Sequence, residues 1–204
     1  MRFIFATLVF LSLFSPAAFA AENPAPLPEA GVIEAYLNGI TTLRAHFIQT
    51  DNGGRQVGGT FLLKRPGRMR FDYAPPVADF IVADGIFVYY YDGQMKQQSN
   101  MLISKSLANF FLRPNLQLSG DIGVSGIRRA EGFLQVTLVQ SGDPSAGSLT
   151  LLFDEHPLQL KKWRIVDAQG LTTEVALSDA ETGITLDSKL FHYYDPTRKN
   201  SQYN

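Results

Sequence analysis

Residues 58–92 read GGTFLLKRPGRMRFDYAPPVADFIVADGIFVYYYD, and this is the most informative part of the chain. It contains eight aromatic residues, and its apolar and polar residues alternate between turn signals. Alternation with a period of two predicts consecutive antiparallel β-strands, and Asp84-Gly85 is a strong hairpin signal between two of them. One cation, Arg65, stands beside Pro66 at the end of an apolar row. The stretch therefore predicts an apolar sheet surface suited first to binding, and to catalysis only if other residues support it.

Further strands are predicted on both sides of this stretch, each bounded by Gly, Asp or Pro. The expected strands cover residues 43–47, 58–65, 68–73, 80–83, 86–91, 95–98, 133–140, 148–153, 158–166, 171–177 and 189–194. No helix alternates with these strands, so a parallel sheet is not expected. Ten or eleven strands at this spacing indicate a strongly curved antiparallel sheet or an open barrel.

Short helices are expected before and between the strands. The first begins at Pro28 and ends near Gly39, because Pro suits a first helical position and Gly an end. Its apolar residues are at one-face helical spacing: Val32, Ile33, Tyr36, Leu37 and Ile40. A second amphipathic helix is predicted over residues 103–111, and residues 115–126 fit either a third small helix or a loop.

The first 20 residues have the pattern of a secretory signal peptide. Arg2 precedes an apolar run over residues 3–14, and Ala18-Phe19-Ala20 has the small-x-small form of a cleavage site. The apolar run is too short for a comfortable membrane span. We expect export with cleavage near Ala20, which leaves residues 21–204 as a single domain.

Composition and missing motifs argue against several classes of function. The 18 basic and 19 acidic residues give a formal net charge of −1, which provides no argument for binding nucleic acid. The chain contains no cysteine, so disulfides and thiolate chemistry are excluded. His46, His156 and His192 lie outside any metal-binding motif, and no nucleophile elbow or Walker loop occurs. We expect neither an enzyme, nor a metal, nor a cofactor.

The register of the Lys64-Arg65-Pro66-Gly67 corner is open from the sequence. A two-residue loop would pair Arg65 with Arg68. A three-residue loop, which we prefer because it gathers the apolar residues, would place these residues on one face: Phe61, Leu63, Arg65, Met69, Phe71 and Tyr73. Arg65 would then lie at the rim of an apolar surface and need an acceptor, such as a helix or loop carbonyl. The alternative is a solvated arginine at a hairpin end.

Six motifs, in this order, resemble the LolA-type outer-membrane lipoprotein carriers of the bacterial periplasm. They are His46-Phe47-Ile48-Gln49, Gly59-Thr60-Phe61, Lys64-Arg65-Pro66-Gly67, Met69-Arg70-Phe71-Asp72-Tyr73, Ile81-Val82-Ala83-Asp84-Gly85 and Val88-Tyr89-Tyr90-Tyr91-Asp92. The resemblance is dense over residues 43–97, continues more weakly through 106–112 and reaches the late strands around 149–154 and 160–166. It implies a mainly β fold, an unclosed antiparallel barrel of about eleven strands covered by a lid of two or three short α-helices, and a periplasmic location.

The resemblance also implies a site. In the family, the arginine of the R-P corner tethers the lid in the empty form, so Arg65 inherits the role of lid latch. The implied lid residues are Leu107, Phe110 and Phe111. The implied acyl-chain cavity is lined by Phe47, Phe61, Leu63, Met69, Phe71, Tyr73, Tyr89 and Tyr91. Which of the three consecutive tyrosines at 89–91 face inward is not determined by the sequence.

The function that the resemblance implies is a non-enzymatic carrier that shields lipoprotein acyl chains and moves them from the inner to the outer membrane. Its expected partners are acylated lipoproteins, an inner-membrane ABC-type lipoprotein-releasing complex and an outer-membrane lipoprotein acceptor, with no nucleic acid, and the carrier is expected to be a monomer. Three alternatives remain from the sequence. They are a carrier or sensor of the same fold for another lipid or glycolipid, an exported hydrolase with a dyad assembled across strands, and an adaptor that uses the aromatic sheet as a protein interface.

Overall fold

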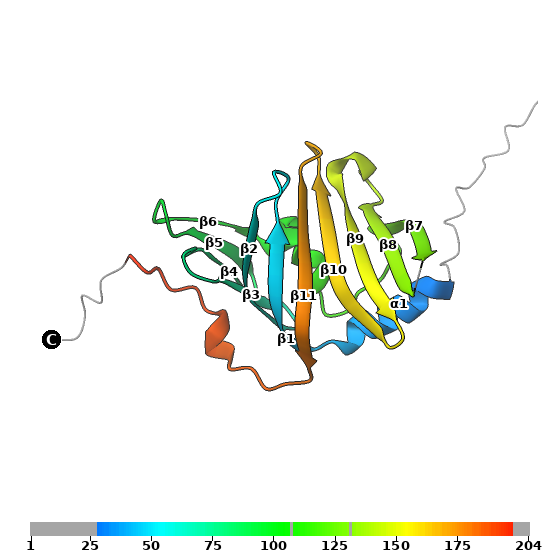
Figure 1. Cartoon of the computed structure of the whole chain (residues 1–204), viewed down its shortest axis with the longest axis horizontal. Coiled ribbons are helices and arrows are strands. Elements are labelled where there is room, and N and C mark those ends of the chain that lie inside the picture. Colours follow the sequence, from blue (N-terminus) through cyan, green and yellow to red (C-terminus); the bar gives the residue numbers. More distant parts are fainter. Residues whose placement is uncertain (1–27, 107, 131, 198–204) are drawn as a thin grey trace, which may run out of the picture.

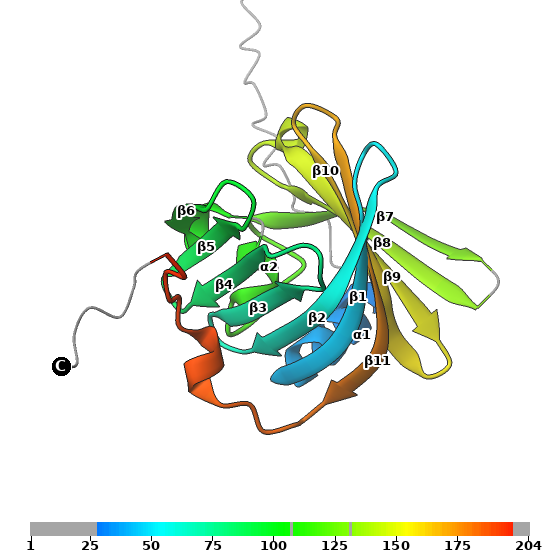
Figure 2. The ribbon, with the colours of Figure 1, turned by 60° about the vertical axis from the view of Figure 1, so that its left-hand side comes forward.

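The computed structural model describes residues 28–106, 108–130 and 132–197. Within these residues, eleven antiparallel strands form one sheet in the order β6-β5-β4-β3-β2-β1-β11-β10-β9-β8-β7 (Figures 1 and 2). Strands β6 and β7 stand at its two edges, so the curved sheet is an unclosed barrel, as predicted. The strands are β1 (Thr42–Thr50), β2 (Gln56–Lys64), β3 (Arg68–Tyr73), β4 (Phe80–Asp84), β5 (Phe87–Asp92), β6 (Gln97–Leu102), β7 (Ile122–Ala130), β8 (Phe133–Gln140), β9 (Gly147–Glu155), β10 (Leu158–Asp167) and β11 (Thr172–Thr182).

The concave face of the sheet holds the core because the strands alternate as the sequence predicts. In β1, the buried residues Leu43, Ala45 and Phe47 alternate with exposed Arg44 and His46. These buried residues join one continuous apolar cluster that extends across both halves of the sheet. The polar residues of β1 are left on the convex face, where Arg44 Nη2 lies 2.7 Å from Glu181 Oε2 of β11.

Gly59 allows the close approach of three strands. It pairs with Phe47 on β1 and with Tyr73 on β3. A Cβ atom at this position would collide with the carbonyl oxygen of Asp72 and lie 2.8 Å from the Phe47 ring. The glycine therefore makes room for the aromatic ring that covers it.

The β2–β3 corner has the three-residue loop preferred from the sequence. Leu63 pairs with Met69, and Lys64 pairs with Arg68, so residues 65–67 form the turn. Gly67 has a φ of +78°, a conformation that other residues rarely adopt. This register places the Phe61 and Leu63 side chains on the same face as Met69 and Phe71.

Helix α1 (Pro28–Gly39) begins and ends where the sequence predicts. Its buried side chains are Ala30, Ile33 and Leu37, at the spacing of one helical face. Val32 was expected on this face but is 60% exposed, because it is turned about 100° from Ile33. The hydroxyl of Tyr36 fixes the helix to the sheet by accepting a 2.8 Å hydrogen bond from Leu160 N of β10.

The predicted helix over residues 103–111 is interrupted. A 3-10 turn spans Ile103–Lys105, Ser106 has an extended conformation with φ −107° and ψ 156°, and helix α2 spans Ala108–Leu112. Leu107 lies outside the described residues. The next segment is a loop that buries Leu116 and Leu118, as one of the two alternatives for residues 115–126 foresaw, but β7 then begins at Ile122 and was not predicted.

The predicted last strand over residues 189–194 is wrong. A 3-10 turn spans Ser188–Phe191, and the chain then follows the outside of β3–β5 (Figure 2). Phe191 is 1% exposed and packs with Leu186 against Leu62 of the convex face, so its burial needs no strand pairing. The expected number of strands was met only because this error offset the missed β7.

The remaining predictions about the ends of the chain fall on residues outside the described part. They are the signal peptide over residues 1–20, cleavage near Ala20 and the boundary of the 21–204 domain. Among the helices that the structure describes, none has the length and apolar character needed to cross a membrane.

Candidate functional site

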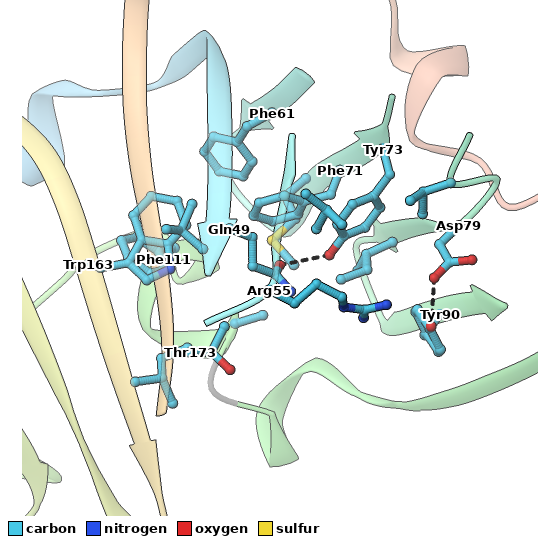
Figure 3. Close-up of a pocket in the computed structure, with 17 residues that line it drawn as sticks. Gln49, Arg55, Phe61, Phe71, Tyr73, Asp79, Tyr90, Phe111, Trp163 and Thr173 are labelled. Atoms are coloured by element: carbon cyan, nitrogen blue, oxygen red, sulfur yellow. Dashed lines mark hydrogen bonds between the residues drawn. The ribbon is translucent and has the colours of Figure 1, made fainter. Parts of the chain in front are cut away.

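A cavity of about 460 Å³ lies between the concave face of the sheet and helix α2 (Figure 3). This volume is in the range of about 300–1,000 Å³ that is common for small-molecule sites. The lining residues are Gln49, Arg55, Val57, Phe61, Met69, Phe71, Tyr73, Val77, Asp79, Ile81, Tyr90, Ala108, Phe111, Trp163, Ile165, Thr173 and Val175. Most of the cavity wall is therefore apolar or aromatic. Its polar residues lie mainly near the ends of the strands.

The aromatic part of the wall follows from the strand register. Phe61 and Phe71 are directly opposed on β2 and β3, and their ring centroids lie 4.5 Å apart. Trp163 of β10 completes the wall, with its ring 5.6 Å from that of Phe61. Close aromatic pairs of this kind stabilise by about 0.5–1.5 kcal/mol beyond the area they bury, so the wall is a firm surface.

The structure places four of the predicted cavity residues on this wall: Phe61, Met69, Phe71 and Tyr73. Phe47 and Leu63 are buried in the same apolar cluster but do not line the cavity. Phe47 supports the wall through edge contacts, with its ring centroid 5.1 Å from Phe71 and 5.3 Å from Tyr73.

The orientation predicted for Tyr89 and Tyr91 is wrong, because Tyr90 is the tyrosine that lines the cavity. Tyr90 pairs with the cavity residue Ile81, whereas Tyr91 pairs with Phe80 on the convex face. Tyr91 stacks on Phe80 at 5.0 Å, and Tyr89 stacks on Tyr193 of the C-terminal segment at 4.8 Å. Both faces of β5 carry aromatic side chains, so the residue pattern does not tell which face turns toward the cavity.

Trp163 lines the cavity but was not predicted, because a shift in strand register changes the face on which it lies. The sheet pairing shifts between Leu160 and Lys162, and this bulge lets Leu160 and Trp163 both be buried although they are three residues apart. Strict alternation would put them on opposite faces. The sequence signal that could have indicated Trp163 is that it is the single tryptophan of a chain rich in Phe and Tyr.

Arg65 joins the β2–β3 corner to both helices. Its Nε donates a 2.6 Å hydrogen bond to the carbonyl oxygen of Phe111, and its Nη1 donates a 2.7 Å bond to that of Leu37. Both carbonyls belong to the last turns of their helices, where carbonyl groups lack intrahelical partners and the helix dipole is negative. Gly67 N adds a 2.9 Å bond to the carbonyl oxygen of Leu112.

The guanidinium of Arg65 is half-buried, and this burial lowers its pKa to about 10. It therefore stays charged near neutral pH. Among the described residues, its side-chain partners are two carbonyl oxygens and no carboxylate. Leaving a buried charge unpaired costs several kcal/mol. The two hydrogen bonds to carbonyl oxygens therefore hold the Arg65 side chain in this position.

Helix α2 separates the cavity from a second space. Phe111 lines the first cavity and lies 5.1 Å from Trp163, measured between ring centroids. Phe110, the other predicted lid residue in the described part, is buried and lines a space of about 550 Å³ beside β8 and β9. The two adjacent rings are almost perpendicular, at 87°.

Four polar residues of the first cavity form two hydrogen-bonded pairs. Tyr73 OH donates a 2.8 Å hydrogen bond to Gln49 Oε1, and Tyr90 OH donates a 3.0 Å bond to Asp79 Oδ2. Burial and then the Asp79 charge raise the pKa of Tyr73 to about 12, and burial with the Asp79 hydrogen bond raises that of Tyr90 to about 12. Both phenols are therefore neutral at physiological pH. Nowhere in the described residues do three His, Cys, Asp or Glu side chains form a cluster that could hold a metal ion.

Comparison with known proteins adds a family assignment. A family model described as outer membrane lipoprotein carrier protein LolA matches residues 38–194. The outer-membrane lipoprotein carrier protein of Methylococcus capsulatus is 30% identical over 175 residues, which cover 80% of this chain and 82% of that protein. The outer-membrane lipoprotein carrier protein of Methylobacillus flagellatus is 26% identical over 207 residues, covering 96% of each chain. A LolA superfamily protein from Nitrosomonas europaea has a solved structure with a TM-score of 0.44 and 11% identity, covering 80% of this chain and 97% of that one.

Proposed function

Because this chain belongs to the LolA family of outer membrane lipoprotein carrier proteins, we propose that it shields lipoprotein acyl chains in the cavity beneath α2 and carries them from the inner to the outer membrane. The observation that carries the proposal is the pair of hydrogen bonds by which Arg65 holds the carbonyls of Phe111 and Leu37. They close an apolar, aromatic cavity with few polar contacts, which is what a reversible cover requires.

The need for such a carrier follows from the cost of hydrating hydrocarbon. Burying one methylene is worth about 0.8 kcal/mol, so a chain of about fifteen methylenes costs about 12 kcal/mol to expose to water. An acylated protein therefore does not cross an aqueous compartment unaided at a useful rate. Its carrier must cover the chains during transit and uncover them at the target membrane.

The size of the cavity determines how many acyl chains it can hold before helix α2 must move. If a methylene is taken to be as large as a water molecule in the liquid, about 30 Å³, a chain of about fifteen methylenes fills roughly 450 Å³. One chain thus matches the cavity of about 460 Å³. Further chains need the second space beyond α2, which Phe110 and Phe111 divide from the first. Loading with several chains therefore displaces α2 from Arg65.

The lid then has two states of similar free energy. In the empty carrier, the two Arg65 hydrogen bonds favour the closed lid; in the loaded carrier, burial of acyl chains favours the open one. When the acyl chains leave, Arg65 forms its two hydrogen bonds again, and this offsets part of the free-energy cost of release. Arg65 is thus the lid latch, and Phe111 is the part of the lid that contacts the cargo.

The route of the cargo follows from the proposed task. The signal peptide over residues 1–20 directs the chain to the periplasm, where it works as a monomer and performs no catalysis. It receives acylated lipoproteins from an inner-membrane ABC-type releasing complex and delivers them to an outer-membrane acceptor.

Identification of the natural cargo tests this proposal. The exported chain is purified from its native host, extracted with organic solvent, and the extract is identified by mass spectrometry. We expect acylated lipoproteins, and we expect more of them with Arg65→Leu than with the matched hairpin variant Arg68→Leu. Free lipid or glycolipid would instead indicate the alternative carrier of the same fold, and an extract without apolar molecules would contradict both.

A further inference from the structure

The polar residues of the cavity lie at the end opposite Arg65. Gln49 is near the end of β1, Arg55 immediately precedes β2, and Tyr73 ends β3, whereas Arg65 follows the other end of β2. The eight steps along β2 correspond to roughly 26 Å at about 3.3 Å per residue. We call Gln49, Arg55, Tyr73, Asp79 and Tyr90 the polar mouth. Figure 3 shows these side chains together on one side of the aromatic wall.

The Arg65 end is closed to a peptide by backbone contacts. Arg65 N donates a 2.8 Å hydrogen bond to the Thr41 carbonyl oxygen, and Gly67 N donates a 2.9 Å bond to that of Leu112. The bond to Thr41 and the side-chain bond from Arg65 to Leu37 do not involve α2, so they hold this end together when α2 is displaced. A ligand whose head is larger than its acyl chains therefore has its exit at the polar mouth.

The polar mouth offers neutral donors and acceptors. The Gln49 carbonyl is used by Tyr73, but its Nε2 has no hydrogen-bond partner among the described residues. The phenol oxygens of Tyr73 and Tyr90 each donate one bond and keep lone pairs that can accept another. Such groups match the carbonyl oxygens of esters and the N–H and C=O groups of amides.

The charges of the polar mouth disfavour an anionic head. Asp79 accepts hydrogen bonds from Gly93 N at 2.9 Å and from Tyr90 OH at 3.0 Å. Arg55 is the cation of the mouth, and its Nε lies 3.2 Å from Asp51 Oδ2. One guanidinium beside two carboxylates gives no net positive charge, so a phosphate would meet repulsion from Asp79 without an unpaired cation to offset it.

We propose that the polar mouth binds the uncharged ester and amide groups at the base of the acyl chains of an acylated peptide. This inference rests on the proposed carrier function and adds the orientation of its cargo. The acyl chains extend from the mouth along the aromatic wall toward Phe111 and Trp163. The peptide leaves the carrier between the loops of residues 51–55 and 74–79, away from Arg65.

Binding measurements with three probes test the orientation. The full exported chain is titrated with a synthetic lipopeptide that carries ester-linked palmitoyl chains on a glyceryl cysteine, with dipalmitoyl phosphatidylglycerol, and with the all-hydrocarbon dye diphenylhexatriene. The mouth variants are Tyr73→Phe and Gln49→Leu, and the control is Tyr89→Phe, which removes a phenol from the convex face. Loss of one hydrogen bond to the head should weaken lipopeptide binding about two- to twelvefold.

The expected pattern is a loss of lipopeptide affinity in both mouth variants, unchanged affinity for the dye, and no loss with Tyr89→Phe. Wild-type protein should bind the lipopeptide more tightly than the phosphatidylglycerol. An equal loss for lipopeptide and dye would show that the mouth residues only support the wall, and it would overturn the proposal, as would unchanged lipopeptide binding or a preference for phosphatidylglycerol. In those cases the carrier function stands, whereas wild-type protein that binds no probe overturns both.

Discussion

The Nε atom of Arg65 lies 2.6 Å from the carbonyl oxygen of Phe111, and this hydrogen bond connects the β2–β3 corner to helix α2. The same guanidinium holds α1 through Leu37, so one side chain contacts the last turns of both helices. Because both partners are carbonyl dipoles, the contact can break without leaving a buried carboxylate behind. This distinguishes it from a buried ion pair, whose separation is far more costly.

Replacement of this side chain should affect the cargo more than the fold. Each hydrogen bond to a charged donor contributes about 1.5–3 kcal/mol, so Arg65→Leu removes several kcal/mol of preference for the closed lid. The apolar replacement also removes the cost of burying a guanidinium, which offsets the loss in folding stability. We expect transfer of a fluorescent lipopeptide to acceptor vesicles to slow by about tenfold or more, with a melting temperature within a few degrees of wild type.

Arg68→Leu is the control for this experiment, because Arg68 lies on the same hairpin and its side chain makes no hydrogen bond or ion pair with the described residues. It should transfer cargo at the wild-type rate. A wild-type transfer rate in Arg65→Leu would refute the latch role.

Gly59→Ala should destabilise the protein through backbone collision. The added Cβ meets the Asp72 carbonyl oxygen and the Phe47 ring, so β1, β2 or β3 must shift. We expect a loss of about 1–3 kcal/mol in the free energy of unfolding, typical of overpacking in a filled interior. Urea denaturation measures it. Gly142→Ala is the control, because a Cβ there has no neighbour within 4 Å, and an equal loss in both variants would contradict the close-approach argument.

The parts of the fold that could be predicted from sequence depend on local signals. Alternating residues bounded by Gly and Pro located β2 to β5. The preferred β2–β3 register was the one found, because the two-residue loop would have put Phe61 and Met69 on opposite faces. Strand β7 was missed because Gly123 and Gly126 interrupt its apolar pattern and its pairing shifts between Val124 and Gly126. The segment near Phe191 reads as a strand, but burial against Leu62 stabilises it without a partner strand.

The candidate site was harder to predict because it depends on which face of each strand turns inward. Phe61 and Phe71 were predicted on the concave face, as the structure has them, since the convex face of their strands is polar apart from Leu62. Tyr89 and Tyr91 were not, because the C-terminal segment provides Tyr193 as an apolar partner on the convex face. The acceptors of Arg65 could not be named from sequence either, since both lie on helices distant in the chain.

Alkaline pH should destabilise the protein partly through Tyr73. Its pKa is about 12 in the folded protein against 10.0 for the unperturbed group, mainly because burial disfavours the phenolate. A raised folded pKa means that the folded state retains a proton that the unfolded state releases above pH 10. The stability contributed by this group is therefore complete below pH 10 and lost as the pH rises to 12, by up to about 2.7 kcal/mol.

Chemical denaturation at several pH values between 9 and 12 measures this effect, and Tyr73→Phe should have a shallower loss of stability than wild type. Tyr194→Phe is the control for removing a phenol, because Tyr194 is 70% exposed. Parallel curves for wild type and Tyr73→Phe would show that Tyr73 is not buried against the cavity as described.

Fluorescence of Trp163 provides the most direct test of the central claim that acyl chains occupy the cavity beneath Phe111. Trp163 is the single tryptophan of the chain, is 4% exposed, and lines the cavity. A lipopeptide with bromine atoms on its acyl chains quenches indole emission on contact, whereas the same lipopeptide without bromine does not. We predict strong quenching that saturates together with binding measured separately. Full binding of the brominated lipopeptide with unchanged Trp163 emission would contradict the account.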